Sequence, residues 1–147
     1  SWWNIDALSK FGVSEDSLPT TFDELYDLAM EAAKQGGSAP IISSLPEIII
    51  TSGDDGKFNF NTDENVDFLQ KYVELYKAKA MPVEVLSDNY TGNAQLYKQE
   101  KVLWTTATSS YPTELKTDNP CLIEKTVVTK RMGEPPLFVQ GIAVSAK

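Results

Sequence analysis

Hydroxyl side chains and one aromatic ring gather where a β-prone segment of the sequence gives way to a helical one. Residues 101–107 include Val102, Leu103 and Trp104, and their composition predicts a strand. The residues that follow are Thr108, Ser109, Ser110, Tyr111 and Pro112. In an open α/β sheet, ligands bind where the carboxyl end of a strand meets the amino end of the next helix. Hydroxyls and a ring at such a junction suit a polar ligand with flat apolar faces, such as a sugar.

The same residues have a simpler interpretation, a Ser/Thr-rich turn closed by a surface tyrosine, because serine and proline are common in turns. Both interpretations place a helix directly after the turn. Ser110 is suited to the N-cap, and Pro112 suits a first helical turn that leads to Leu115. A short helix is also expected before the strand, in the stretch that begins at Asn93.

The composition bounds the possible functions. The chain has 147 residues, enough for one domain with a sizeable core, and its 41% apolar fraction is ordinary for a globular protein. A net charge of −8 opposes binding to nucleic acid, which needs Lys and Arg to neutralise phosphates. No basic run is available to hold an anionic membrane, and the apolar run at 48–50 is far too short to span one.

Most catalytic chemistry is excluded by the residues that the sequence lacks. There is no histidine, so a Ser-His-Asp or Cys-His arrangement within this chain is impossible. Cys121 is the single cysteine, which excludes an internal disulfide and the usual zinc sites. We expect no catalytic residues, no metal and no cofactor. Catalysis by a carboxylate pair stays formally open, since the chain has 21 acidic residues.

Two long helices are predicted with clear starts. Thr21 and Glu24 form a capping-box pattern that begins a helix with an apolar stripe, and Gly36 and Gly37 end it. Thr62 begins the second helix, over 63–80. Its apolar residues recur at helical spacing and are expected to form core or core rim: Val66, Leu69, Tyr72, Val73 and Tyr76.

Shorter elements complete an α/β pattern. Trp2 and Trp3 are expected to pack on the core, with Asn4 or Asp6 capping a short helix that Gly12 ends. Residues 53–61 are turn-rich and suit a loop or a hairpin. Further strands are predicted at 39–42, 126–129 and 137–145. Helices that alternate with short apolar strands predict an α/β layer fold.

Four blocks in order resemble the extracytoplasmic solute-binding proteins of ABC transporters, of the family 1 sugar-binding, maltose-binding-protein-like type. Residues 3–8, WNIDAL, resemble that family's YNKDLF segment, and residues 19–25, PTTFDEL, resemble its PKTWDEL. Residues 97–104, YKQEKVLW, resemble F-x-x-G-K-x-A-M. Residues 138–144, FVQGIAV, resemble the strand GG-x-x-(L/I)-x-I. The order and spacing of these blocks cover nearly the whole chain.

The resemblance implies one lobe of a type II periplasmic-binding-protein fold, a mixed sheet flanked by helices, over residues 1–147. The other lobe would be absent, and the two lobes would close on a solute by a hinge. Implied partners are a small-molecule solute, a sugar by preference, and the permease subunits of an ABC importer. The implied location is extracytoplasmic, with the membrane reached only through the permease or through a lipid anchor outside this chain.

The expected ligand-binding residues on the cleft side of this lobe are Ser43, Ser44, Thr108, Ser109, Tyr111 and Gly141. The hydroxyls would bond the polar groups of the solute, Tyr111 would stack on it or hydrogen-bond to it, and Gly141 would let the backbone come close. Trp104 is expected in the core.

Three positions depart from the family pattern. Glu100 stands where the family usually has glycine, so the preceding helix must end without an easy left-handed residue or end differently. Gln140 replaces the first glycine of the late pair, and Ser109 or Ser110 stands where maltose binders have tryptophan. Other functions remain open: a carboxylate-dependent glycoside hydrolase, a carbohydrate-interaction domain, or a protein-interaction domain with a large exposed apolar patch.

Overall fold

The computed structural model describes residues 1–36, 51–52, 58–59, 61–86 and 92–132. Ser43, Ser44 and Gly141, with the strands predicted at 39–42 and 137–145, lie outside the described residues. Within them, no helix is long and apolar enough to cross a membrane.

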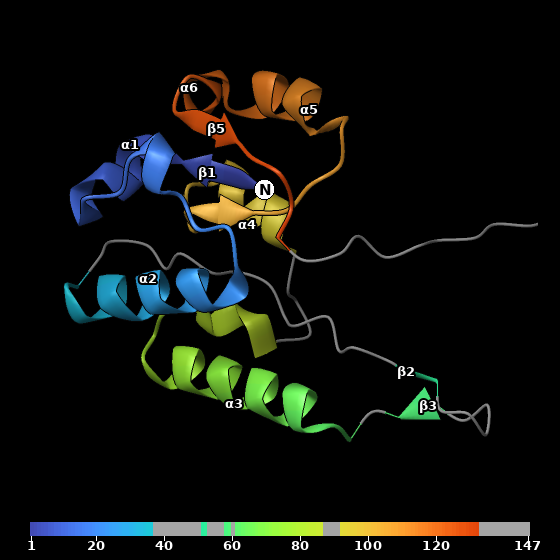
Figure 1. The fold of residues 1–147 in the computed structure, drawn as a ribbon. Coiled ribbons are helices and arrows are strands. Elements are labelled where there is room, and N and C mark those ends of the chain that lie inside the picture. Colours follow the sequence, from blue (N-terminus) through green and yellow to red (C-terminus); the bar gives the residue numbers. More distant parts are fainter. Residues whose placement is uncertain (37–50, 53–57, 60, 87–91, 133–147) are drawn as a thin grey trace, which may run out of the picture.

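Helices outnumber strands in the described part of the chain (Figure 1). The α-helices are α1 (Ile5–Leu8), α2 (Phe22–Lys34), α3 (Asp63–Lys77), α4 (Asn93–Lys98), α5 (Tyr111–Asp118) and α6 (Pro120–Ile123). The 3-10 helices are η1 (Ser9–Phe11), η2 (Glu15–Ser17) and η3 (Val83–Leu86). The strands are β1 (Trp2–Asn4), β2 (Thr51–Ser52), β3 (Phe58–Asn59), β4 (Trp104–Thr105) and β5 (Thr126–Val128).

A small antiparallel sheet with the order β4-β1-β5 lies between two groups of helices. Figure 1 shows α5 and α6 on one side of this sheet, and α2 and then α3 on the other. Strands β2 and β3 pair as a separate antiparallel hairpin, as the turn-rich sequence allowed. The α/β class predicted from the sequence is confirmed, but every strand pair among the described residues is antiparallel, so the predicted mixed sheet is not seen there.

Strand β1 joins the two sides of the molecule because neighbouring side chains of a strand point to opposite faces of the sheet. Trp3 is fully buried in a cluster with Trp104 and residues of α2 and α3, and the Trp3 and Trp104 ring centroids lie 6.0 Å apart. Trp2 belongs to the opposite cluster, which is formed mainly by α4, α5 and α6. The two tryptophans are both buried, as predicted, and each anchors a different core.

Local signals place the helix starts correctly. The Thr21 hydroxyl accepts a bond from the Glu24 amide, and the Glu24 carboxylate accepts one from the Thr21 amide, completing the predicted capping box. Asn4 caps α1 by accepting a bond from the Ala7 amide, and Gly12 follows η1 with a φ of 77°. Thr62 caps α3 by accepting a bond from the Asn65 amide.

The face that α3 buries differs from the predicted one. Its stripe residues Val66, Leu69, Val73 and Tyr76 are exposed, and of the predicted set only Tyr72 is buried. The buried side of the helix instead includes Leu75, with Phe68 partly buried against the Phe22 ring of α2 at a centroid distance of 4.3 Å. Helix α2 packs against only one edge of the apolar stripe, at Phe68 and Tyr72, so the rest of the stripe faces solvent.

Two further predictions need correction at the ends of elements. The strand expected over 101–107 is only two residues long, because β1, its partner, offers just two facing pairs, Trp2 with Thr105 and Trp3 with Trp104. Helix α3 ends at Lys77 rather than near residue 80. Glu100 takes the left-handed conformation, with a φ of 55°, at the position where a glycine would be relaxed.

Candidate functional site

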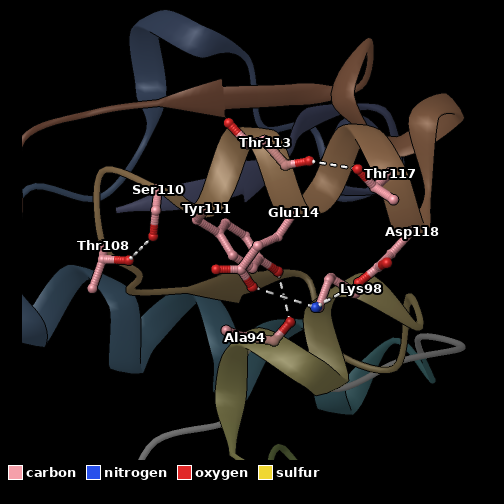
Figure 2. A network of polar contacts seen from close by, with 9 residues as sticks. All are labelled: Ala94, Lys98, Thr108, Ser110, Tyr111, Thr113, Glu114, Thr117 and Asp118. Carbon is pink, nitrogen blue, oxygen red and sulfur yellow. Dashed lines mark hydrogen bonds and ion pairs between the residues drawn. The ribbon is translucent and has the colours of Figure 1, made fainter.

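Three hydroxyl residues are exposed between the end of β4 and the start of α5, and we call Thr108, Ser109 and Ser110 the rim. The Thr108 and Ser110 hydroxyl oxygens lie 2.9 Å apart and share a hydrogen bond (Figure 2). Ser110 occupies the N-cap position of α5 as predicted, but its side chain makes no cap bond there. Three hydroxyls that face solvent beside one another can exchange hydrogen bonds with a polyhydroxylated ligand.

Tyr111 does not stand on this rim, so the prediction that it faces the cleft is wrong. Its side chain is 2% exposed and lies in a cluster with Trp2, Tyr97 and Leu115. The Trp2 ring meets it edge-to-face at a centroid distance of 5.2 Å. The Tyr111 hydroxyl donates a 2.6 Å bond to the Ala94 carbonyl, and burial raises the pKa of the phenol. The ring therefore has no free face on which a sugar could stack.

A second contact between α4 and α5 comes from Lys98, whose side chain is 11% exposed. Its ammonium nitrogen lies 2.7 Å from an Asp118 carboxylate oxygen and 3.6 Å from a Glu114 oxygen (Figure 2). The hydrogen bond to Asp118 is the main cause of the raised pKa of Lys98. Because α5 supplies both carboxylates and α4 supplies the cation, the pair holds these helices together.

Asn119 extends the same attachment beyond the end of α5. Its side-chain amide donates to the Lys98 carbonyl at 3.0 Å, while its carbonyl oxygen accepts a bond from the Leu122 amide and caps α6. Sequence analysis did not single out Lys98 or Asn119. Asn119 directly before Pro120 is a helix-start signal that could have shown α6.

The other predicted site residues fall into two groups, those outside the described residues and those on the rim. Ser43, Ser44 and Gly141 lie outside the described residues, so their part in the site stays a prediction. Thr108 and Ser109 are exposed at the expected junction, which is compatible with the predicted role of their hydroxyls.

A groove of about 320 Å³ lies elsewhere, between the first turns of α2 and α3. It is lined by Thr21, Phe22, Asp23, Glu64, Asp67, Phe68 and Lys71. The Lys71 ammonium lies 2.8 Å from Asp23 and 2.9 Å from Asp67, so these two carboxylates are engaged in ion pairs. Across the part of the chain that the structure describes, no group of three His, Cys, Asp or Glu residues is placed to hold a metal ion.

Comparison with solved structures shows the fold to which this geometry belongs. The chain is similar to a proposed oligosaccharide periplasmic-binding protein from Synechococcus sp. MITs9220, with 19% identity and a TM-score of 0.67. A second structure with the same description, in complex with zinc, gives 17% identity and a TM-score of 0.69. In both cases the match covers 85% of this chain and 34% of the other. No protein-family model and no curated protein matches the sequence.

The described chain therefore has the fold of one part of a periplasmic-binding protein, and it spans about a third of the length of the structures it matches. At this level of identity the match establishes the fold alone. The rim is the exposed polar feature at the strand-to-helix junction of that fold.

Proposed function

We propose that this chain is a solute-binding lobe whose rim forms one wall of a cleft for a sugar or a related polar solute. The observation that carries the proposal is the fold match, since both matched structures are described as oligosaccharide periplasmic-binding proteins. The rim agrees with it, because Thr108, Ser109 and Ser110 present exposed hydroxyls that can exchange hydrogen bonds with a polyhydroxylated solute.

In this proposal the lobe binds and releases its solute without chemical change. It would deliver the solute to the permease subunits of an ABC importer, and it would work outside the cytoplasm. The resemblance to the family 1 sugar-binding type supports these finer points. Ser43, Ser44 and Gly141 would add to the same wall.

The hydrolase alternative receives no support from the described acidic residues. Glu24 has a lowered pKa, caused first by a hydrogen bond from the Thr20 backbone, whereas a general acid needs a raised one. Asp23 and Asp67 at the α2–α3 groove are both paired with Lys71.

Calorimetry of the full-length protein against a panel of neutral mono- and oligosaccharides tests the proposal. At least one sugar should bind, and the variant Thr108→Ala/Ser109→Ala/Ser110→Ala should bind it more weakly. Each lost hydrogen bond should raise Kd by about two- to ten-fold. Thr113→Ala, an exposed change in α5, is the matched control and should leave Kd unaltered. Binding by the triple variant at the wild-type Kd would remove the rim from the site.

A further inference from the structure

We infer that Tyr111 and Lys98 are positioning residues that hold the rim in its binding geometry by fixing α5 to α4. The inference rests on the proposed function for its link to solute binding, but its structural part can be measured without a ligand. It replaces the predicted role of Tyr111 as a ligand contact with a role beneath the contact surface.

The first step of the argument is the position of Tyr111. It directly follows Ser110 and is the first residue of α5, so the attachment of its side chain to α4 restrains the backbone next to the rim. The rim is also tied to α5 through the backbone: the Tyr111 amide donates to the Thr108 carbonyl at 3.2 Å, and the Thr113 amide donates to the Ser110 carbonyl at 3.1 Å. The rim and the first turn of α5 are therefore one hydrogen-bonded unit.

The second step is how that unit is attached. Positions 111, 114 and 118 are three and four residues apart, so they share one face of α5. Each of them contacts α4: Tyr111 bonds the Ala94 carbonyl, and Glu114 and Asp118 approach Lys98 (Figure 2). Contacts at both ends of α5 prevent it from tilting on α4.

The third step concerns the strength of these contacts. The Tyr111 side chain is buried, so water competes little for its hydrogen bond to the Ala94 carbonyl. The Lys98 side chain is largely buried, whereas the side chains of its carboxylate partners are about half exposed. Contacts of this kind hold a surface helix more firmly than fully exposed ion pairs do.

Hydrogen exchange of the ligand-free, full-length protein tests the attachment. Tyr111→Phe removes only the hydroxyl, and Lys98→Met removes only the charge. Both variants keep backbone amides at positions 111 and 113. These two amides should exchange about two- to ten-fold faster than in the wild-type protein, while the α2 amides keep their wild-type rates. Lys98→Arg should restore slow exchange.

Thr117→Ala is the matched control, because the Thr117 hydroxyl donates to the Thr113 carbonyl within α5 (Figure 2). It should leave the Tyr111 amide at its wild-type rate. Unchanged exchange in Tyr111→Phe and Lys98→Met would overturn the inference. So would equal acceleration in α2 and α5, which would show a general loss of stability.

Solute binding gives the second readout. With the sugar that binds best in the calorimetric panel, Tyr111→Phe and Lys98→Met should raise Kd by about two- to ten-fold, and Lys98→Arg should not. An unchanged Kd despite faster exchange would overturn the positioning role. If the wild-type protein binds no sugar of the panel, the proposed function fails, and the exchange rates still decide whether α4 fixes the rim.

Discussion

The two sides of the β4-β1-β5 sheet both contain aromatic and aliphatic side chains, but they differ in how completely these side chains are buried. On the α4–α5–α6 side, aromatic rings are buried and their polar atoms are paired: the Tyr97 hydroxyl bonds Thr126 and the Tyr111 hydroxyl bonds Ala94. On the α2–α3 side, rings also meet between the helices, but α3 leaves much of its apolar stripe exposed. The side that carries the rim is thus the more completely enclosed one.

In the proposed function, this difference would keep the binding surface rigid. Polar groups that lie under the rim are paired with neighbours far along the chain, so the surface above them has few ways to rearrange. The α2–α3 side is joined across its helices by aromatic contacts and by exposed pairs such as Lys71 with Asp23. Exposed pairs contribute little to stability.

The largest predicted effect separates two leucines of the same helix. Leu75 is fully buried and Leu69 is 42% exposed. Leu75→Ala should lower the free energy of unfolding by about 2–5 kcal/mol, because it removes buried methyl groups and leaves a cavity. Leu69→Ala should cost less than about 1 kcal/mol. Chemical denaturation measures both, and equal losses would show that the exposed stripe of α3 is covered in solution.

The second prediction concerns alkaline pH and the enclosed side. Burial raises the pKa of both Tyr97 and Tyr111 above that of a free tyrosine, which is near 10. Their contribution to stability is fully present below about pH 10 and is lost as the pH rises from there towards the folded-state pKa. In that range the phenols ionise in the unfolded chain but stay protonated in the folded protein, so ionisation favours unfolding. Denaturation between about pH 8 and about pH 11 should show this loss.

Tyr111→Phe is the informative variant for that experiment. It keeps the buried ring and removes one of the two ionising groups, so stability should fall less steeply with rising pH than in the wild-type protein. An identical slope in the two proteins would mean that the Tyr111 phenol is not held protonated in the folded state.

The third prediction addresses the start of α2. Thr21→Ala removes the hydroxyl that accepts the Glu24 amide, and should destabilise the protein by about 1 kcal/mol. Thr21→Ser keeps the hydroxyl and should cost much less. Thermal unfolding of the three proteins measures this, and a serine variant as unstable as the alanine variant would count against the cap.

The smallest effect is expected at the end of α4, and it has the opposite sign. Glu100→Gly should stabilise the protein by less than about 1 kcal/mol, since glycine adopts the left-handed conformation without strain but loses more entropy on folding. Glu100→Ala is the control, because it keeps the strain and loses the 3.3 Å contact between Glu100 and the Asn119 amide. If Glu100→Ala also stabilises the protein, the unfavourable contribution of Glu100 comes from its carboxylate rather than from its left-handed backbone.

Prediction from sequence succeeded at several helix ends whose decisive contacts lie within one turn of chain. The Thr21 and Glu24 capping box, the Asn4 cap of α1 and the left-handed Gly12 each depend on residues at most four positions apart. Of the candidate site residues, Tyr111 is not where the sequence predicts it. Thr108 and Ser109 lie exposed at the expected junction. The sequence around Tyr111 does not indicate whether its side chain points to solvent or into the core.

The amino-acid sequence was enough to locate the two main helices, to predict the burial of Trp2 and Trp3, and to exclude histidine chemistry within this chain. The tertiary structure alone decided that Tyr111 turns inward, because its partner Ala94 lies 17 residues away and Trp2 lies at the other end of the chain. It also decided which arc of α3 is covered, because an apolar stripe does not specify the direction from which a neighbouring helix packs. Local patterns form helices, whereas burial depends on neighbours that the chain brings in from elsewhere.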